Sequence, residues 1–214
     1  MESQVKNKII TVLLSVVFSS FLVLSFSKTD GCIPVEEVVK TEEVIKKGIE
    51  ESNETILVQK KMEKILQIID KKEKLLAFKK IKREHSGIFE KDETIEDYFT
   101  ESELNLLYMV VEAEITEGDF DSKVNIANVV LNRYYDGRFG ESLIDILNKE
   151  QFESVSNKRY KKVKVTEDTK LACEYAFIFE DTTFGSLYFE MLNTNVHHKY
   201  ADYLFSDGYH KFYK

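Results

Sequence analysis

The chain has 214 residues, enough for one or two domains at about 150 residues each, and 43% of its residues are hydrophobic. Its formal net charge of −8 argues against nucleic acid as the partner, because phosphate binding needs a basic face. Two cysteines are too few for a disulfide framework, and a single proline with 8 glycines favours a helix-rich chain over a turn-rich all-β one.

The first predicted element is a membrane segment. Residues 1–8 carry Lys6 and Lys8, and residues 9–26 are free of charged side chains. That run is longer than the roughly 7–15 residues of a signal-peptide core and reaches the roughly 17–25 needed to span a bilayer. We therefore predict a cytoplasmic segment over 1–8 and a transmembrane signal-anchor over 9–26. By the positive-inside rule, the protein is then a single-pass protein of the cell membrane whose remaining chain faces the wall.

Two alternatives to an uncleaved anchor remain at this end of the chain. Ser25-Phe26-Ser27 resembles a small-x-small cleavage site, and Cys32 is a position for lipidation, although the residues before it fit a lipobox poorly. In all three cases the rest of the chain is exported.

Residues 27–97 are predicted to form a helical stalk and linker. Apolar residues recur there at helical spacing among many lysines and glutamates, as in Met62, Ile65, Leu66, Ile69 and Leu76. A sustained coiled coil needs three or four uninterrupted heptads, and this stripe is shorter. The stalk separates the membrane from a working domain, and self-association of two copies through the stripe is the alternative role.

Residues 98–214 have the composition of a globular domain. Thr100 and Glu103 form a capping box at the start of a helix that ends near Gly118. The later segments predict a mainly α (α+β) fold. Helices are predicted from Asp121 or Ser122 to Asp136, from Ser142 to Lys149 and from Thr166 to Phe179. A hairpin or exposed strand is predicted over Lys158–Val165, and a strand over Ser186–Leu192.

The helix that follows the capping box of Thr100 and Glu103 is apolar nearly all round, yet this stretch carries Glu112, Glu114 and Glu117. Aliphatic residues precede Glu114 at the spacings of one and two helical turns, whereas Glu112 has a tyrosine at that place and Glu117 lies at the helix end. Removal from water raises the pKa of a carboxyl group. Glu114 is therefore the best placed of the three to deliver a proton as a general acid, and the alternative is a solvated or salt-bridged residue.

Several segments resemble, in the same order, motifs of the bacterial cell wall hydrolase family that includes the spore-cortex-lytic enzymes of germination. The resemblance covers about residues 100–214. The matching segments are Ala113-Glu114-Ile115, Val130-Leu131-Asn132-Arg133, Gln151-Phe152-Glu153-Ser154-Val155, Tyr188-Phe189, and Gly208-Tyr209-His210-Lys211-Phe212.

The resemblance implies a lysozyme-like helical domain that cleaves the MurNAc–GlcNAc bond of peptidoglycan by lytic transglycosylation, with Glu114 as the catalytic residue. The family's motif has glycine where this chain has Ala113 and arginine where it has Thr116, so a degenerate, non-catalytic wall-binding or assembly protein is one alternative. A muramidase that uses water is the other, and Glu117, Asp119 and Asp121 are its candidates for a second acid.

Substrate contacts are predicted at Tyr188, Phe152, Glu117 and Asn132, since these lie in the matching segments or beside the catalytic glutamate. Aromatic side chains there can stack on sugar rings, with core packing as the alternative. Adjacent histidines at 197 and 198 point to different sides of most backbones and lack further ligands, so we predict neither a metal nor a cofactor.

Overall fold

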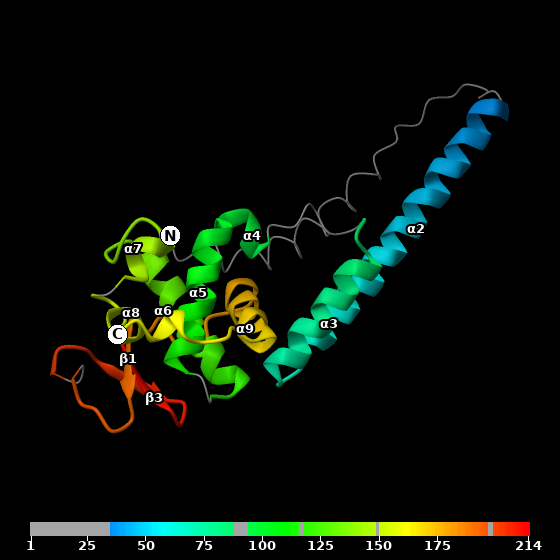
Figure 1. The fold of residues 1–214 in the computed structure, drawn as a ribbon. Helices are drawn as coiled ribbons and strands as arrows, with labels where there is room; N and C mark the ends of the chain where they lie inside the picture. The colour runs from blue at the N-terminus through cyan, green and yellow to red at the C-terminus, as the bar shows by residue number, and fades with distance from the viewer. Residues whose placement is uncertain (1–34, 88–93, 116–117, 149, 197–198) are drawn as a thin grey trace. The chain divides into compact units, whose positions relative to one another are not determined.

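The computed structural model describes residues 35–87, 94–115, 118–148, 150–196 and 199–214. It divides the chain into two compact units (Figure 1). The first, the hairpin unit, spans residues 1–69 and 76–92, and the second, the C-terminal unit, spans residues 70–75 and 93–214.

The hairpin unit contains α2 (Val35–Leu66) and most of α3 (Lys71–Glu84). Its small apolar core consists of Val58, Met62 and Ile65, with Ile68, Ala77, Phe78 and Ile81 packed against them. The predicted apolar stripe is therefore split: Met62 and Ile65 are buried within one chain, whereas Ile69 is 94% exposed. Self-association through the stripe stays a prediction.

None of the described helices is long and apolar enough to cross a membrane. The predicted anchor over residues 9–26 lies outside the described residues, so it stays a prediction.

The C-terminal unit begins earlier than residue 98. Ile95–Tyr98 form the short helix α4, which has a capping box between Thr94 and Asp97, and Ile95 is almost fully buried. The predicted linker therefore extends too far at its C-terminal end, because Ile95 packs in the core of the C-terminal unit although acidic residues surround it in the sequence.

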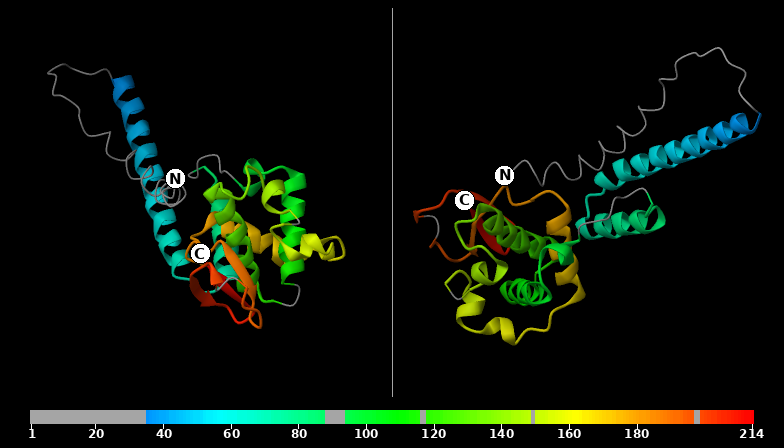
Figure 2. Two further views of the ribbon diagram at one scale, coloured as in Figure 1. Left: turned by 90° about the vertical axis from the view of Figure 1, so that its left-hand side faces the viewer. Right: turned by 90° about the horizontal axis from the view of Figure 1, so that it is seen from above.

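Three longer helices form the body of the C-terminal unit: α5 (Glu101–Glu114), α6 (Phe120–Asp136) and α9 (Glu167–Ile178). They pack against one another, and Figure 2 shows them from two further sides. The predicted capping box of Thr100 and Glu103 is confirmed. Helix α6 ends at Gly137, whose φ of 77° lies in the left-handed region that glycine adopts readily.

The segment between α6 and α9 differs most from prediction. The predicted helix over Ser142–Lys149 is only the short α7 (Leu143–Ile146), followed by the equally short α8 (Glu153–Ser156). The hairpin or strand predicted over Lys158–Val165 is wrong, since this segment forms the 3-10 helix η2 (Arg159–Lys161) and then irregular chain. Alternating polarity produces a strand only where a neighbouring strand can pair with it.

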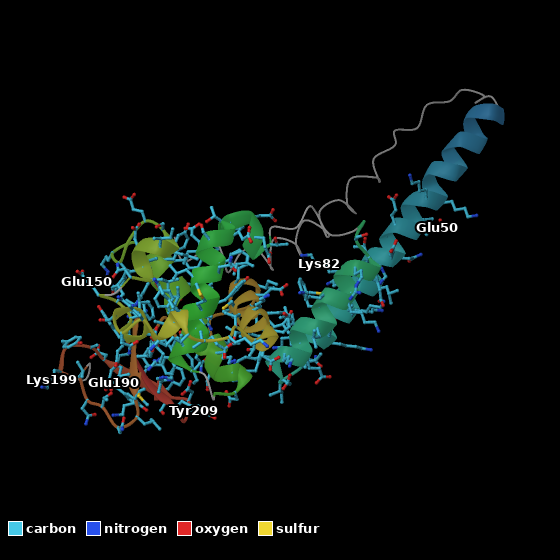
Figure 3. The ribbon with its side chains drawn as sticks, viewed as in Figure 1. Glu50, Lys82, Glu150, Glu190, Lys199 and Tyr209 are labelled. Carbon is cyan, nitrogen blue, oxygen red and sulfur yellow. The ribbon has the colours of Figure 1, made fainter. Side chains whose placement is uncertain are left out.

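A small antiparallel sheet completes the unit, with strand order β1-β3-β2. Its strands are β1 (Tyr188–Met191), β2 (Tyr203–Ser206) and β3 (His210–Tyr213). Phe212 is fully buried in the central strand, and the Tyr213 hydroxyl donates to Glu190, which is labelled in Figure 3, at 2.6 Å. The prediction of a mainly α fold with a small β element is confirmed, whereas a likeness to lysozyme stays a prediction.

Candidate functional site

Glu114 is the last residue of α5, and its side chain is 9% exposed. The main-chain N–H of Ser154 in α8 donates to Glu114 Oε1 at 3.1 Å. On the other carboxylate oxygen, Arg159 of η2 forms an ion pair with an Nη2–Oε2 distance of 3.6 Å. Two short elements from later in the chain therefore hold the side chain in one orientation and keep it from pointing into bulk water.

The ion pair lies at the surface of the unit, because the Arg159 side chain is 45% exposed. The preceding residue, Lys158, has a φ of 63° and turns the chain from α8 into η2. Such a left-handed conformation is uncommon for a residue other than glycine. This turn is what brings Arg159 back towards the end of α5.

Arg133, on α6, is a second cation near Glu114. It is almost fully buried, and its guanidinium carbon lies 5.0, 4.8 and 5.6 Å from the ring centroids of Phe139, Phe152 and Tyr188. Burial lowers the pKa of Arg133 to about 10, although the charges of Tyr188 and Glu114 act in the opposite direction. Arg133 is therefore still charged at neutral pH, and it places a second positive charge in the surroundings of Glu114.

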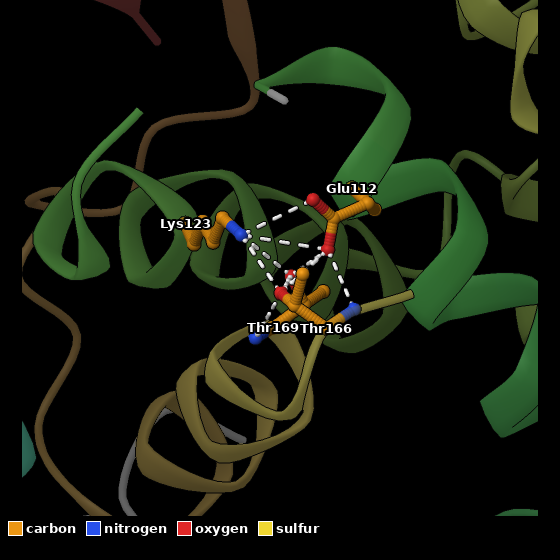
Figure 4. A network of polar contacts seen from close by, with 4 residues as sticks. All are labelled: Glu112, Lys123, Thr166 and Thr169. Atoms are coloured by element: carbon orange, nitrogen blue, oxygen red, sulfur yellow. Dashed lines mark hydrogen bonds and ion pairs between the residues drawn. The ribbon is translucent and has the colours of Figure 1, made fainter. Parts of the chain in front are cut away.

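Glu112, two residues before Glu114, lies in a different environment (Figure 4). It is 2% exposed, and its carboxylate faces the ammonium group of Lys123 at 3.3 Å. Oε2 also accepts hydrogen bonds from the main-chain N–H of Thr166 at 3.0 Å, from the Thr166 hydroxyl at 2.8 Å and from the Thr169 hydroxyl. Lys123 in turn donates to both threonine hydroxyls. This buried network joins α5, α6 and the start of α9.

The two glutamates differ because of helix geometry. Residues two apart on an α-helix point about 200° away from each other, so Glu112 faces α6 and α9, whereas Glu114 faces α8 and η2. Burial raises the pKa of Glu112, but the hydrogen bonds from Thr169 and Thr166 and the charge of Lys123 outweigh burial, so the net shift is downward. Glu112 is therefore an ionised structural residue.

Comparison with family models gives a match to the model described as Cell Wall Hydrolase, over residues 117–213. This part of the chain belongs to the cell wall hydrolase family. The family resemblance inferred from the sequence motifs is thereby confirmed. The match begins after Glu114, so it does not itself include the proposed catalytic residue.

A solved structure that is similar to this chain is the crystal structure of the catalytic domain of the Bacillus cereus SleB protein. It is 21% identical, and the match covers 54% of this chain and 92% of that chain with a TM-score of 0.49. Comparison with curated proteins gives no match.

The predicted substrate-binding residues of the hydrolase domain lie in different settings. Phe152 is 3% exposed, and its ring lies against Arg133, so in this structure it packs in the core. Asn132 donates from Nδ2 to Asp181, Thr183 and the carbonyl of Ser186. Both residues therefore support the fold around the site, and a direct contact with substrate stays a prediction for each.

Tyr188 is the predicted substrate-binding residue with the most suitable place. It is partly exposed, lies close to Arg133, and its ring centroid is 6.3 Å from that of Tyr200. Tyr200 is itself 64% exposed, which makes the pair a surface on which a sugar ring can stack. Glu117 lies outside the described residues.

No group of three or more histidine, cysteine, aspartate or glutamate side chains among the described residues of the hydrolase could hold a metal ion. His197 and His198 lie outside that part of the chain. His210 is 4% exposed, and its main-chain N–H donates to Asp207 at 2.8 Å. Burial lowers the pKa of its ring.

Arg159 is the site residue that sequence reasoning missed. It lies in a run of lysines that reads as an exposed basic strand, and its partner is far away in the sequence. The chain has Thr116 where the family's motif places an arginine close to the catalytic glutamate. This departure is the one feature of the sequence that indicates a cation beside Glu114 supplied by another segment.

Proposed function

We propose that the chain is an exported, membrane-anchored peptidoglycan lytic transglycosylase in which Glu114 is the single general acid and base. The observation that carries this proposal is the carboxylate of Glu114, which is nearly buried and is held between Ser154 and Arg159 at the edge of a cell wall hydrolase domain. A carboxylate with a fixed orientation at the surface of an otherwise packed unit suits proton transfer to a bound sugar.

One carboxyl group is enough for this reaction. Glu114 in its acid form donates its proton to the glycosidic oxygen, and the bond between that oxygen and the muramyl anomeric carbon breaks. The resulting carboxylate then accepts the proton of the muramyl 6-hydroxyl, whose oxygen bonds to the anomeric carbon. The product is a 1,6-anhydro end, and the side chain has regained its proton.

Two of the neighbouring acids, Glu112 and Asp119, are unsuited to be the second free acid that two-carboxylate glycosidases need beside the scissile bond. Glu112 is buried and its carboxylate is occupied by Lys123 and two threonines. Asp119, a candidate for the second acid, accepts a hydrogen bond from the main-chain N–H of Ser122 as the N-cap of α6.

Export and anchoring are proposed from the charge-free run over residues 9–26, which follows two lysines. In this proposal the helices of residues 35–84 hold the hydrolase domain near the outer face of the cytoplasmic membrane. Extraction of cell membranes with carbonate should leave the full chain in the pellet, and its release into the soluble fraction would show a cleaved signal instead.

Product analysis tests the reaction type. Sacculi digested by the full chain should give muropeptides with 1,6-anhydro ends, which are lighter by one water than the reducing ends left by a muramidase. Mass spectrometry with and without borohydride separates them, because only reducing ends take up hydrogen. Reducing ends in place of anhydro ends would assign the muramidase reaction.

Replacement of Arg159 tests the positioning of Glu114. We expect Arg159→Ala to lower kcat about 10- to 100-fold with little change in KM, because an unrestrained carboxyl group loses its alignment with the sugar oxygen. Arg159→Lys should recover part of this loss, since the charge returns without the guanidinium geometry. An unchanged kcat in Arg159→Ala would show that the ion pair plays no part in catalysis.

A further inference from the structure

A dense group of cations lies next to the site. Residues 158–164, called here the basic segment, contain Lys158, Arg159, Lys161, Lys162 and Lys164, although the whole chain has a net charge of −8. All five side chains are exposed. The segment packs against the end of α5 through η2, where Arg159 contacts Glu114.

The lysines of the basic segment are not neutralised within the described part of the chain. Arg159 pairs with Glu114, but none of the four lysines forms an ion pair with a described residue. Lys161 instead lies 5.6 Å above the ring centroid of Tyr160. A surface patch that carries charge of one sign attracts a partner of the opposite sign, here an anionic one.

We propose that the lysines of the basic segment bind the carboxylates of the peptide stems of peptidoglycan. This inference rests on the proposed function, in which Glu114 acts at a muramyl residue. The peptide stem is attached to the lactyl group of that same sugar, so its carboxylates lie within a short reach of the bond that Glu114 protonates. The cations that begin at Arg159 meet this requirement, and the segment extends along the exposed chain to Lys164.

The position of the segment decides between two anionic components of walls. Every stem peptide is attached next to the muramyl anomeric carbon, so it has a fixed place relative to the scissile bond, and the experiment below removes phosphate-bearing polymers as the other source of negative charge. The substrate class is therefore glycan that still carries its anionic peptides, and the patch also offsets the repulsion between an acidic enzyme and an anionic wall.

The test compares charge variants in a Glu114→Gln background, so that the wall is bound without being cut. The reversed variant carries Lys161→Glu, Lys162→Glu and Lys164→Glu in the full chain. The matched control carries Lys46→Glu, Lys60→Glu and Lys64→Glu, which are exposed residues of α2 and change the net charge equally. Co-sedimentation measures the apparent Kd on sacculi that have been treated with hydrofluoric acid to remove phosphate polymers.

We expect the reversed variant to bind these sacculi about tenfold more weakly than the control, because three exposed ion pairs are lost. On the same sacculi after their carboxyl groups have been converted to neutral amides, the two variants should bind alike. Equal binding to the peptide-bearing sacculi would overturn the proposal, and so would a difference that persists on the amidated sacculi or that appears only before the acid treatment. If the reversed variant does not fold, the triple change to glutamine should still weaken binding about threefold.

Failure of the proposed function has a different signature. In that case the chain with an intact Glu114 gives no glycan fragments, whatever the charge variants bind. Loss of the binding difference with normal fragments would refute the basic segment alone.

Discussion

Replacement of Glu114 by glutamine should reduce the release of glycan fragments from purified sacculi by about 10²–10⁴-fold, the range that general acid–base catalysis supplies. Glutamine keeps the size of the side chain and can still accept from the main-chain N–H of Ser154, but it has no proton to donate to the sugar oxygen. The measurement is the initial rate of fragment release, followed by mass spectrometry.

Glu153→Gln is the matched control for this variant. Glu153 lies next to Ser154 at the start of α8 and is exposed, so its change removes one negative charge near the site without touching the network around Glu114. Its rate should stay near that of the wild type, and both variants should unfold at the same temperature. Wild-type fragment release by Glu114→Gln would show that the chain acts as a binding protein or uses another acid.

The long helices are predictable from sequence because their signals are local. The capping box of Thr100 and Glu103 needs only residues three apart, and Thr166 accepts from Thr169 in the same way at the start of α9. Gly137 ends α6 in the left-handed conformation. Each signal acts within one turn of chain, so no knowledge of tertiary contacts is required.

The sheet and the partners of the glutamates depend on contacts between distant residues. Strands β2 and β3 have four residues each, and their register depends on pairing with one another and with β1. Likewise, Arg159 reaches Glu114 only because Lys158 turns the chain. Neighbour chemistry within α5 selected Glu114 among three acids, but it missed the network that holds Glu112 in the core.

Removal of Lys123 is the second change with a large expected effect. Lys123→Met should lower the free energy of unfolding by about 3–5 kcal/mol, because the carboxylate of Glu112 is then left in the core without its countercharge. Unfolding in urea, followed by circular dichroism, measures this difference. Arg138→Met, which breaks the exposed pair with Asp136, is the control and should leave the midpoint nearly unchanged.

The double variant Lys123→Met with Glu112→Leu shows whether the instability of Lys123→Met comes from the unpaired carboxylate of Glu112 or from the loss of the ion pair itself. An apolar pair of similar volume removes both charges, so most of the stability lost in Lys123→Met should return. The hydroxyls of Thr166 and Thr169, whose oxygens lie 3.0 Å apart, can then donate to each other once Glu112 no longer accepts their protons. A double variant as unstable as Lys123→Met would mean that the fold needs the ion pair itself.

The wild type and the double variant should also differ in how their stability depends on pH. The folded state lowers the pKa of Glu112 below its ordinary value of 4.5, so the folded protein binds fewer protons there than the unfolded chain does. The resulting stabilisation is fully present above about pH 4.5 and is lost as the pH falls through the lower, folded pKa. Between pH 7 and pH 3 the wild type should therefore lose more stability than the double variant, which has no carboxyl group at position 112.

Because Glu103 and Asp136, whose pKa values are also lowered, are present in both proteins, their effects cancel in this comparison. Parallel pH profiles of the two proteins would refute the assignment of Glu112 as an ionised, structural partner of Lys123.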